Sequence, residues 1–193
     1  MRAISYRTHG PAEVLELIPN FPFPQPKNGQ LLIKIEAVGL NPRDAKLRAN
    51  IIPTVIMPTP KIIATDFCGR VISIDKSISN EFHVNERVIG MMELFFTQYG
   101  AAAEYVVVEE KLLAHAPENL SSIQCAAIPL TSLTVYQALK SYIKYMKCDI
   151  INNNYEPLKG KRILIQAGSG GVGSFAIQYC KHILGMYVLT TCS

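Results

Sequence analysis

The first part of the chain shows the pattern of short strands separated by turns. Residues 31–38 alternate between apolar and polar side chains, as a strand with one buried face does. Shorter apolar runs bounded by turn residues predict further strands at 2–6, 14–18, 71–74, 87–91, 103–108 and 112–114. Strands of this length and spacing predict a closed or partly closed β-barrel over residues 1–118.

The pattern becomes helical after residue 120. Ser121 and Gln124 have the spacing of a capping box, in which two side chains satisfy free amides at a helix start. From there to Met146 the apolar residues recur with the period of a helix, with an interruption at Pro129. Residues 148–160 are polar and rich in turn formers, so a surface loop is expected there.

The end of the chain has the pattern strand, helix, strand. Residues 162–166 form a compact apolar run that is typical of a buried parallel strand. A helix is predicted over 172–184 with Gly185 as its C-cap, and a second strand over 186–191. The predicted fold class is therefore α/β, with a β-barrel domain at 1–118 and a first βαβ unit within 119–193.

Glycines gather in the turn between this strand and this helix. Gly168, Gly170 and Gly173 give the motif G-x-G-x-x-G directly after a predicted strand and at the start of a predicted helix. Such glycines let the backbone approach a pyrophosphate, which the free amides and the dipole of the helix start bind. A glycine turn that binds nothing is the alternative, and the context favours NAD(P)H.

The end of the second strand bears on the choice of nucleotide. NAD-binding units usually carry Asp or Glu there, which binds the ribose diol and repels a 2′-phosphate. The corresponding residues here are not acidic: Thr190, Thr191, Cys192 and Ser193. The sequence therefore favours NADPH, with NADH as the alternative, and Ser193 is a candidate donor to the phosphate.

Composition narrows the class of protein. The chain has 193 residues, 49% of them hydrophobic, and a net charge of +4 with no long basic run, so neither disorder nor nucleic-acid binding is expected. No apolar stretch is long enough to span a membrane, and no leader is evident. A cytoplasmic protein is predicted, or a mitochondrial one whose leader was removed. The five cysteines lack CxxC spacing, which argues against zinc ligation.

Five stretches of the chain carry a family resemblance in their order and spacing: residues 38–44, 65–71, 103–108, 126–134 and 168–173. Through them the chain resembles the medium-chain dehydrogenase/reductase superfamily, in the zinc-free quinone oxidoreductase branch of zeta-crystallin and the reticulon-4-interacting reductase. The resemblance implies a GroES-like barrel joined to a Rossmann domain, with NADPH in the cleft between them. It also implies hydride transfer to a quinone or enone-type acceptor.

The resemblance also implies roles for individual residues. By position, it assigns cofactor binding to Asn41, Thr134, Ser169, Gly170, Gly171, Val172, Gly173 and Ser193. Asn41 would lie near the nicotinamide, and Asn41 and Asp44 are the candidates for a catalytic role. For Asp44 and Asp66 the alternative is that they satisfy backbone groups beside their turns.

Zinc-dependent relatives have Cys at the position of Asn41 and Gly-His-Glu at the position of Ala64-Thr65-Asp66. Asn and Thr are poor zinc ligands, so no metal is expected, and an already activated acceptor needs orientation more than a Lewis acid. Two departures from the family concern turns. Ala64 replaces a glycine, and Asn85 starts a turn where the family has Gly-Asp-Arg; Asn adopts the left-handed conformation readily.

The length of the chain leaves two hypotheses. A doubly wound domain needs about 130 residues, and about 32 follow from Arg162 onward, enough for one βαβ unit. In the first hypothesis the chain is part of an NADPH-dependent reductase, a homodimer when full-length, and is weakly active or inactive alone. In the second it is a non-catalytic GroES-like binding module or a pseudoenzyme with a vestigial nucleotide-binding arm.

Overall fold

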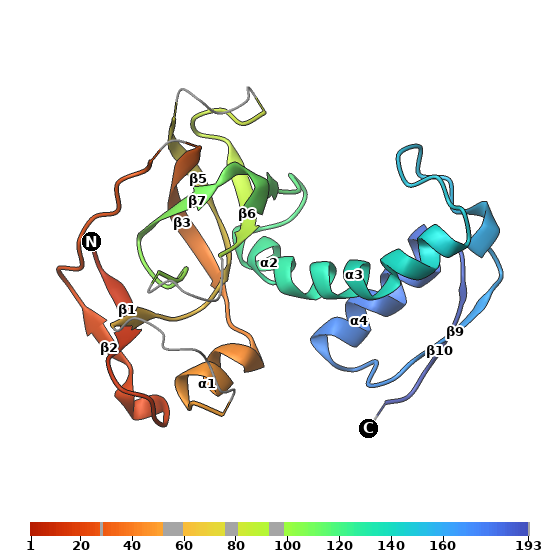
Figure 1. The fold of residues 1–193 in the computed structure, drawn as a ribbon, viewed down its shortest axis with the longest axis horizontal. Coiled ribbons are helices and arrows are strands. Elements are labelled where there is room, and N and C mark those ends of the chain that lie inside the picture. The colour runs from red at the N-terminus through yellow and green to blue at the C-terminus, as the bar shows by residue number, and fades with distance from the viewer. Residues whose placement is uncertain (28, 52–59, 76–80, 93–98, 193) are drawn as a thin grey trace. The chain divides into compact units, whose positions relative to one another are not determined.

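The computed structural model describes residues 1–27, 29–51, 60–75, 81–92 and 99–192 (Figure 1). The chain forms two compact units, Met1–Pro129 and Leu130–Ser193. This division falls later than the predicted domain boundary at residue 118. Helix α2 (Ser122–Ala126) lies between the two positions and packs on strands of the first unit. The capping box of Ser121 and Gln124 is confirmed at its start.

The first unit contains two antiparallel sheets (Figure 1). In the smaller, β1 (Ala3–Tyr6) pairs with β2 (Glu16–Ile18) and β4 (Lys61–Ile62). The larger has the order β7-β3-β5-β6-β8, and its strands are Gln30–Gly39 (β3), Asp66–Ile74 (β5), Arg87–Met91 (β6), Tyr105–Glu109 (β7) and Leu113–His115 (β8). A bridge between Ala3 and Ala103 joins the sheets, as a partly closed barrel requires.

The predicted strand bounds differ most from the observed ones where pairing with a neighbouring strand determines the length of a strand. Strand β5 begins at Asp66, well before the predicted start at 71, because the whole length of β3 is available to pair with it. The two-residue strand β4 was not predicted. The predicted strand 14–18 is shorter, because Ala12–Val14 forms a 3-10 turn (η1) before β2. A second 3-10 turn, η2 (Glu110–Leu112), separates β7 from β8.

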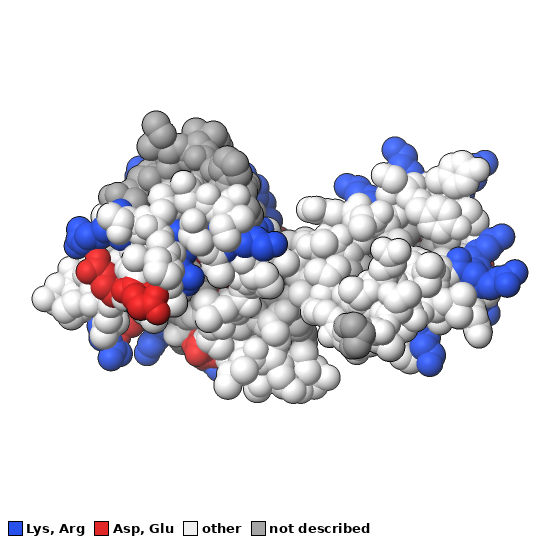
Figure 2. All heavy atoms as spheres, turned by 90° about the horizontal axis from the view of Figure 1, so that it is seen from below, with Lys and Arg blue, Asp and Glu red and all other residues white. Residues whose placement is uncertain are grey.

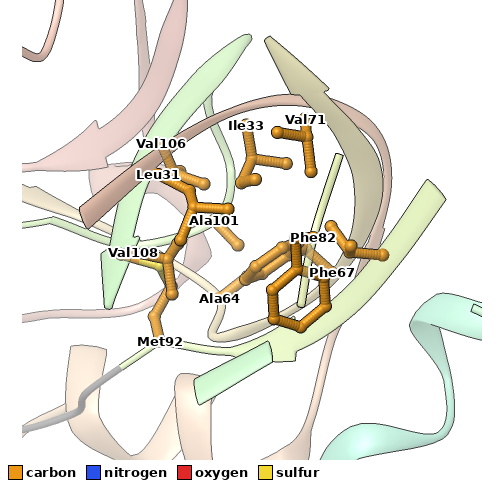
Figure 3. Close-up of a cluster of buried hydrophobic side chains, with 11 residues drawn as sticks. Leu31, Ile33, Ala64, Phe67, Val71, Phe82, Met92, Ala101, Val106 and Val108 are labelled. Atoms are coloured by element: carbon orange, nitrogen blue, oxygen red, sulfur yellow. The ribbon is translucent and has the colours of Figure 1, made fainter. Parts of the chain in front are cut away.

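The core of the first unit lies on one face of the larger sheet (Figure 3). Strand β3 contributes Leu31 and Ile33, and β5 contributes Phe67 and Val71, at alternating positions. All four side chains are fully buried. Figure 3 shows the ring of Phe67 beside Phe82, which closes the cluster. The remaining members are Ala64, Val88, Met92, Ala101, Val106 and Val108.

Asn85 and Ala64 are two of the residues of the first unit that have left-handed backbone. Asn85 has φ +70°, which confirms that Asn supplies the conformation for which the family uses glycine. Ala64 has φ +64° and is buried in the core. An alanine in this region carries steric strain of about 1 kcal/mol, which a glycine would avoid. The glycine that Ala64 replaces therefore has a conformational role.

Helix α1 (Pro42–Arg48) was not predicted, although its start signals are present in the sequence. Asn41 is the N-cap, Pro42 occupies the first helical position, and Asp44 stands at the third. The helix is only seven residues long, so its apolar pattern is too short to indicate a period.

The second unit contains the predicted βαβ arrangement. Helix α3 (Pro129–Tyr145) begins at Pro129, which explains the interruption at that residue. Strands β9 (Arg162–Ile165) and β10 (Tyr187–Thr190) pair in parallel, and α4 (Gly171–Gln178) with the π-helical segment η4 (Tyr179–Ile183) connects them. Gly185 has φ +65°, which confirms the C-cap. The predicted loop at 148–160 contains one short 3-10 turn, η3 (Glu156–Leu158).

The predicted burial of β9 is wrong on one face. Ile163 and Ile165 pack on a core formed by Ile143, Leu158, Cys180, Leu184 and Met186. Leu164 points the other way and is 60% exposed. Successive side chains of a strand face opposite sides, and within the described residues β9 has a packed layer on one side only. The continuous apolar run of residues 162–166 therefore led to the wrong prediction that both faces of β9 are buried.

Candidate nucleotide-binding site

The glycine turn lies where the motif requires it. It follows the carboxyl end of β9, and Gly170 is the N-cap of α4. The parallel partner β10 ends beside it, because the amide of Gly168 donates to the carbonyl of Thr191 at 2.8 Å. The amide of Ala167 donates to the Thr191 hydroxyl at 3.1 Å. The turn is thus held from both strands, at the carboxyl edge where open α/β sheets bind ligands.

Two glycines of the motif are required by packing. A Cβ on Gly168 would overlap the hydroxyl of Thr190, and a Cβ on Gly173 would overlap the carbonyl oxygen of Ala167. Both glycines are buried. They bring the start of α4 close against the end of β9, which is the helix–strand approach expected from the motif.

The two glycines between them are not required by packing of the chain. A Cβ on Gly170 or on Gly171 would come no closer than 3.4 Å to any neighbour, and Gly170 has ordinary extended backbone. Both residues are exposed. The absence of side chains here leaves the helix start open.

The helix start beside this space has amides for which no carbonyl partner is found among the described residues. The first helical amides, those of Gly171, Val172 and Gly173, have no carbonyl one turn earlier to bind, and Ser174 is the first to donate back, to Gly170 at 2.8 Å. Within the described part of the chain no acceptor is recorded for these three amides or for that of Ser169. The amide of Gly170 donates to Ala167 at 3.1 Å, so this residue offers space and not a donor. A helix start with such amides is the kind of place at which proteins bind anions.

Helix α3 passes beside the same turn. The methyl carbon of Thr131 lies 3.4 Å from the place of a Cβ on Gly171. Thr134 is one turn further along and shares that side of the helix. Its hydroxyl donates to the carbonyl of Leu130 at 2.7 Å and still has lone pairs to accept with. Ser193, the remaining predicted cofactor residue, lies outside the described residues.

A second group of polar residues lies in the first unit, at the start of α1. Asn41 donates from its side-chain amide to the Asp66 carboxylate at 3.1 Å, and from its backbone to the Asp44 carboxylate at 2.7 Å. Asp66 is buried and also accepts from the Thr65 hydroxyl at 3.3 Å. Arg43 donates to the same hydroxyl at 2.9 Å. The structure thus brings both predicted catalytic candidates, Asn41 and Asp44, into one network.

Lys61 and Tyr6 belong to this neighbourhood, and sequence reasoning missed both. Each is buried, and they are cross-strand partners in the pairing of β1 with β4. Burial lowers the pKa of Lys61 to about 8, and the Asp44 carboxylate opposes that shift. Burial also raises the pKa of Tyr6 and of Asp44. No local motif contains this pair, because residues 6 and 61 meet only through the strand pairing.

A small cavity of about 20 Å³ lies among Tyr6, Asp44, Lys61, Thr65 and Tyr99. Its volume suits about one water molecule, given polar partners on its wall. Of the groups on its wall, Lys61 and Asp44 have pKa values that burial moves towards neutrality, whereas the pKa of Tyr6 moves away from it. Across the described residues, no three His, Cys, Asp or Glu side chains are grouped as metal ligands would be. In the same part of the chain, no helix combines the length and apolar character of a membrane span.

The comparisons with known proteins agree with this architecture. Residues 27–118 match the alcohol dehydrogenase GroES-like domain. The chain is 36% identical over 188 residues to 2-methylene-furan-3-one reductase of Solanum lycopersicum, covering 96% of this chain and 45% of that protein. It is 35% identical over 193 residues to quinone-oxidoreductase QR1, chloroplastic, of Triphysaria versicolor, covering 100% and 55%.

Among solved structures, Escherichia coli quinone oxidoreductase complexed with NADPH matches with a TM-score of 0.76 and 25% identity, covering 100% of this chain and 52% of that one. Fold and site together define a GroES-like barrel followed by the first βαβ unit of a Rossmann fold, as predicted. The chain is thus similar along its length to quinone oxidoreductases of the medium-chain dehydrogenase/reductase superfamily, and residues 27–118 match the alcohol dehydrogenase GroES-like domain. It spans about half the length of the relatives it matches.

Proposed function

We propose that this chain is the front part of an NADPH-dependent oxidoreductase that transfers hydride to a quinone or an enone-type acceptor. The observation that carries the proposal is the start of α4, where free amides face a space that two glycines leave open. The relatives named as quinone oxidoreductases and as a furanone reductase support the acceptor class.

The residues of the second unit fit the nucleotide. The amides of Ser169, Gly171, Val172 and Gly173 would hold the pyrophosphate, Gly170 would admit it, and Thr134 would contact the cofactor from α3. NADPH supplies the hydride when bound. The end of β10 offers Thr190 and Thr191 and no carboxylate, so nothing there repels a 2′-phosphate, which favours NADPH over NADH. Ser193 is proposed as a donor to that phosphate.

In the first unit we assign Asn41 a place near the nicotinamide and the acceptor. Asp66 holds its side-chain amide, so the carbonyl end of that amide has a defined direction. Asp44 is engaged by the backbone of Asn41 and raises the pKa of Lys61, which suits a positioning residue better than a proton donor. Orientation of the reacting groups by such fixed contacts is the main contribution a protein makes when the cofactor carries the chemistry.

We also propose that the enzyme works without zinc. The residues at the position of the relatives' zinc ligands are engaged with one another, and the Arg43 guanidinium donates to Thr65 within that network. A fixed positive charge at this place opposes binding of a divalent cation. The cytoplasmic location and the homodimeric parent also stay predictions, and some relatives are named as chloroplastic or mitochondrial.

The test is titration of the chain with NADPH and with NADH, followed by nucleotide fluorescence. Gly171→Ala fills the open space without a clash inside the chain and should weaken NADPH binding by about tenfold, as loss of a phosphate approach does. Gln178→Ala, on the exposed end of the same helix, is the matched control and should bind as the parent chain does. Equal affinity of all three proteins, or no binding at all, would refute the nucleotide site.

The second candidate function is a non-catalytic GroES-like binding module or pseudoenzyme. A binding module or pseudoenzyme would bind nucleotide weakly or not at all and would not turn over. An assay of NADPH oxidation with a simple quinone distinguishes the enzyme from the non-catalytic module. Turnover by this chain that Gly171→Ala lowers at limiting NADPH excludes the non-catalytic module, whereas tight binding without turnover indicates that the catalytic parts lie in the remaining length of the relatives.

A further inference from the structure

The charge of the chain is concentrated in the second unit. Residues 130–193 contain seven basic residues (Lys or Arg) and two acidic residues (Asp or Glu). Residues 1–129 contain twelve basic and thirteen acidic residues. The excess of basic residues therefore belongs to the smaller unit, although no run in the sequence reveals it. In the view of Figure 2, the part of the molecule formed by this unit shows Lys and Arg side chains and no Asp or Glu.

The seven basic residues lie on or just after α3, at or just before the start of β9, and on η4. All are exposed, and most stand within three positions of a member of the core formed by Ile143, Leu158, Cys180, Leu184 and Met186. They are Lys140, Lys144, Lys147, Lys159, Lys161, Arg162 and Lys181. We call this set the basic end. The two acidic side chains of the unit are engaged locally, Asp149 by Asn152 at 2.7 Å and Glu156 by Lys159 at 3.2 Å.

The basic end lies away from the proposed nucleotide site. Strand β9 starts at Arg162 and ends at the glycine turn, and β10 runs parallel to it. Helix α4 starts at that turn, and its continuation η4 carries Lys181. The glycine turn and the basic end therefore stand at opposite ends of the βαβ unit. A pyrophosphate at the helix start does not account for these lysines.

Exposed apolar and aromatic side chains lie on the same segments as these lysines or on the loop between them. Ile151 is 92% exposed, Tyr145 is 79% exposed, and Ile183 is 53% exposed. Tyr145 is next to Lys144 at the end of α3, and Ile151 projects from the turn between Asp149 and Asn154. Lysines attract a negatively charged surface from a distance, and a protruding Ile and Tyr gain by entering the boundary between headgroups and acyl chains.

We propose that the second unit docks through its basic end on a membrane surface rich in anionic lipid. Six of the seven basic residues are Lys, which act as point charges towards a diffuse anionic surface, whereas phosphate recognition in nucleic acids favours the planar fork of Arg. Ile151 has no ring with which to stack a base. An aliphatic side chain exposed to this degree beside lysines fits a lipid interface best.

Sedimentation of the 193-residue chain with vesicles tests the proposal. Vesicles of phosphatidylcholine with about 30 mol% phosphatidylserine should bind the chain, and pure phosphatidylcholine vesicles should not. Lys140→Glu with Lys144→Glu should lower the bound fraction about tenfold, since each lysine near such a surface contributes measurably. Lys27→Glu with Lys34→Glu, exposed lysines of the first unit, makes the same change in net charge and should bind as the parent does.

A second variant separates lipid from other anionic partners. Ile151→Ser keeps the charge and changes a side chain that contacts almost nothing, so the fold is retained; vesicle binding should fall by about threefold. Unchanged binding by Ile151→Ser, equal loss in both lysine variants, or binding to pure phosphatidylcholine would overturn the proposal. So would tighter binding to a single-stranded oligonucleotide than to the anionic vesicles.

Discussion

The glycine turn of the second unit and the polar network of the first unit are built from different parts of the chain. The turn is made of consecutive residues, and its donors are backbone amides whose direction follows from the helix start. The network is made of side chains from the start of α1, from β1 and β4, and from the start of β5, which meet only after the sheets have formed. A site made of consecutive residues can be predicted from a sequence motif, whereas a site whose residues meet through strand pairing cannot.

The largest expected effect is a difference in stability between alanine variants at Gly173 and at Gly171. Gly173→Ala places a methyl group on the carbonyl oxygen of Ala167 and should destabilise the second unit by about 3 kcal/mol or more. Gly171→Ala meets no such contact and should leave the free energy of unfolding within about 0.5 kcal/mol of the parent value. Urea unfolding followed by circular dichroism measures both. Similar stability of the two variants would mean that the turn does not pack as described.

The next effect concerns the buried ammonium of Lys61. Burial lowers its pKa from 10.5 to about 8, so the unfolded chain holds this proton more tightly than the folded chain does. The contribution of Lys61 to the free energy of unfolding therefore rises with pH between about 8 and 10.5, and it is least favourable below 8.

Replacing this lysine by an apolar side chain of similar length should remove that dependence. Lys61→Met is expected to stabilise the first unit by about 1–2 kcal/mol at pH 7 and to flatten the pH profile above 8. Lys34→Met, on an exposed position of β3, is the control and should change neither. A profile for Lys61→Met as steep as that of the parent would contradict the burial of this charge.

The fold was predictable to the extent that local patterns determine it. The strand at 31–38 and the βαβ unit follow from alternation, from a capped helix and from Gly185 as a stop signal. Helix α1 was missed because seven residues show no period, and β4 because two residues become a strand only through pairing with β1.

The glycine turn, whose donors are backbone amides, was predictable from its motif. The network of side chains around Asn41 was predicted only in part. The resemblance supplied Asn41 and Asp44, but their link to Lys61 and Tyr6 depends on a pairing between residues far apart in the chain. Burial of β9 was overestimated because an apolar run reports the composition of a strand and not the layers that cover it.

A smaller effect is expected at the start of α1. Asp44→Ala removes the acceptor for the backbone amide of Asn41 and should cost about 1 kcal/mol of stability, as loss of a helix cap does. It also removes the negative charge that opposes the shift of Lys61, so the pKa of Lys61 should fall further below 8. Titration of the Lys61 side chain by NMR measures the second effect. A rise in that pKa would show that Asp44 does not act on the lysine.

The smallest effect concerns the left-handed turn at Ala64. Ala64→Gly relieves the strain of φ +64° and gives up one buried methyl group, so a net stabilisation of about 0.5 kcal/mol is expected. Ala101→Gly, at another buried core position, lacks the strain and should destabilise instead. Thermal unfolding of the two variants compares them, and a loss of stability in Ala64→Gly would mean that packing outweighs backbone strain there.

The proposed nucleotide site depends most on the backbone amides at the start of α4. A 15N-labelled chain titrated with NADPH reports each amide separately. We predict that the amide signals of Ser169, Gly171, Val172 and Gly173 shift most, because these donors face the open space, and that Gly168 shifts less, because it is already bound to Thr191. NADPH binding that leaves these four signals in place and moves others instead would contradict the nucleotide site.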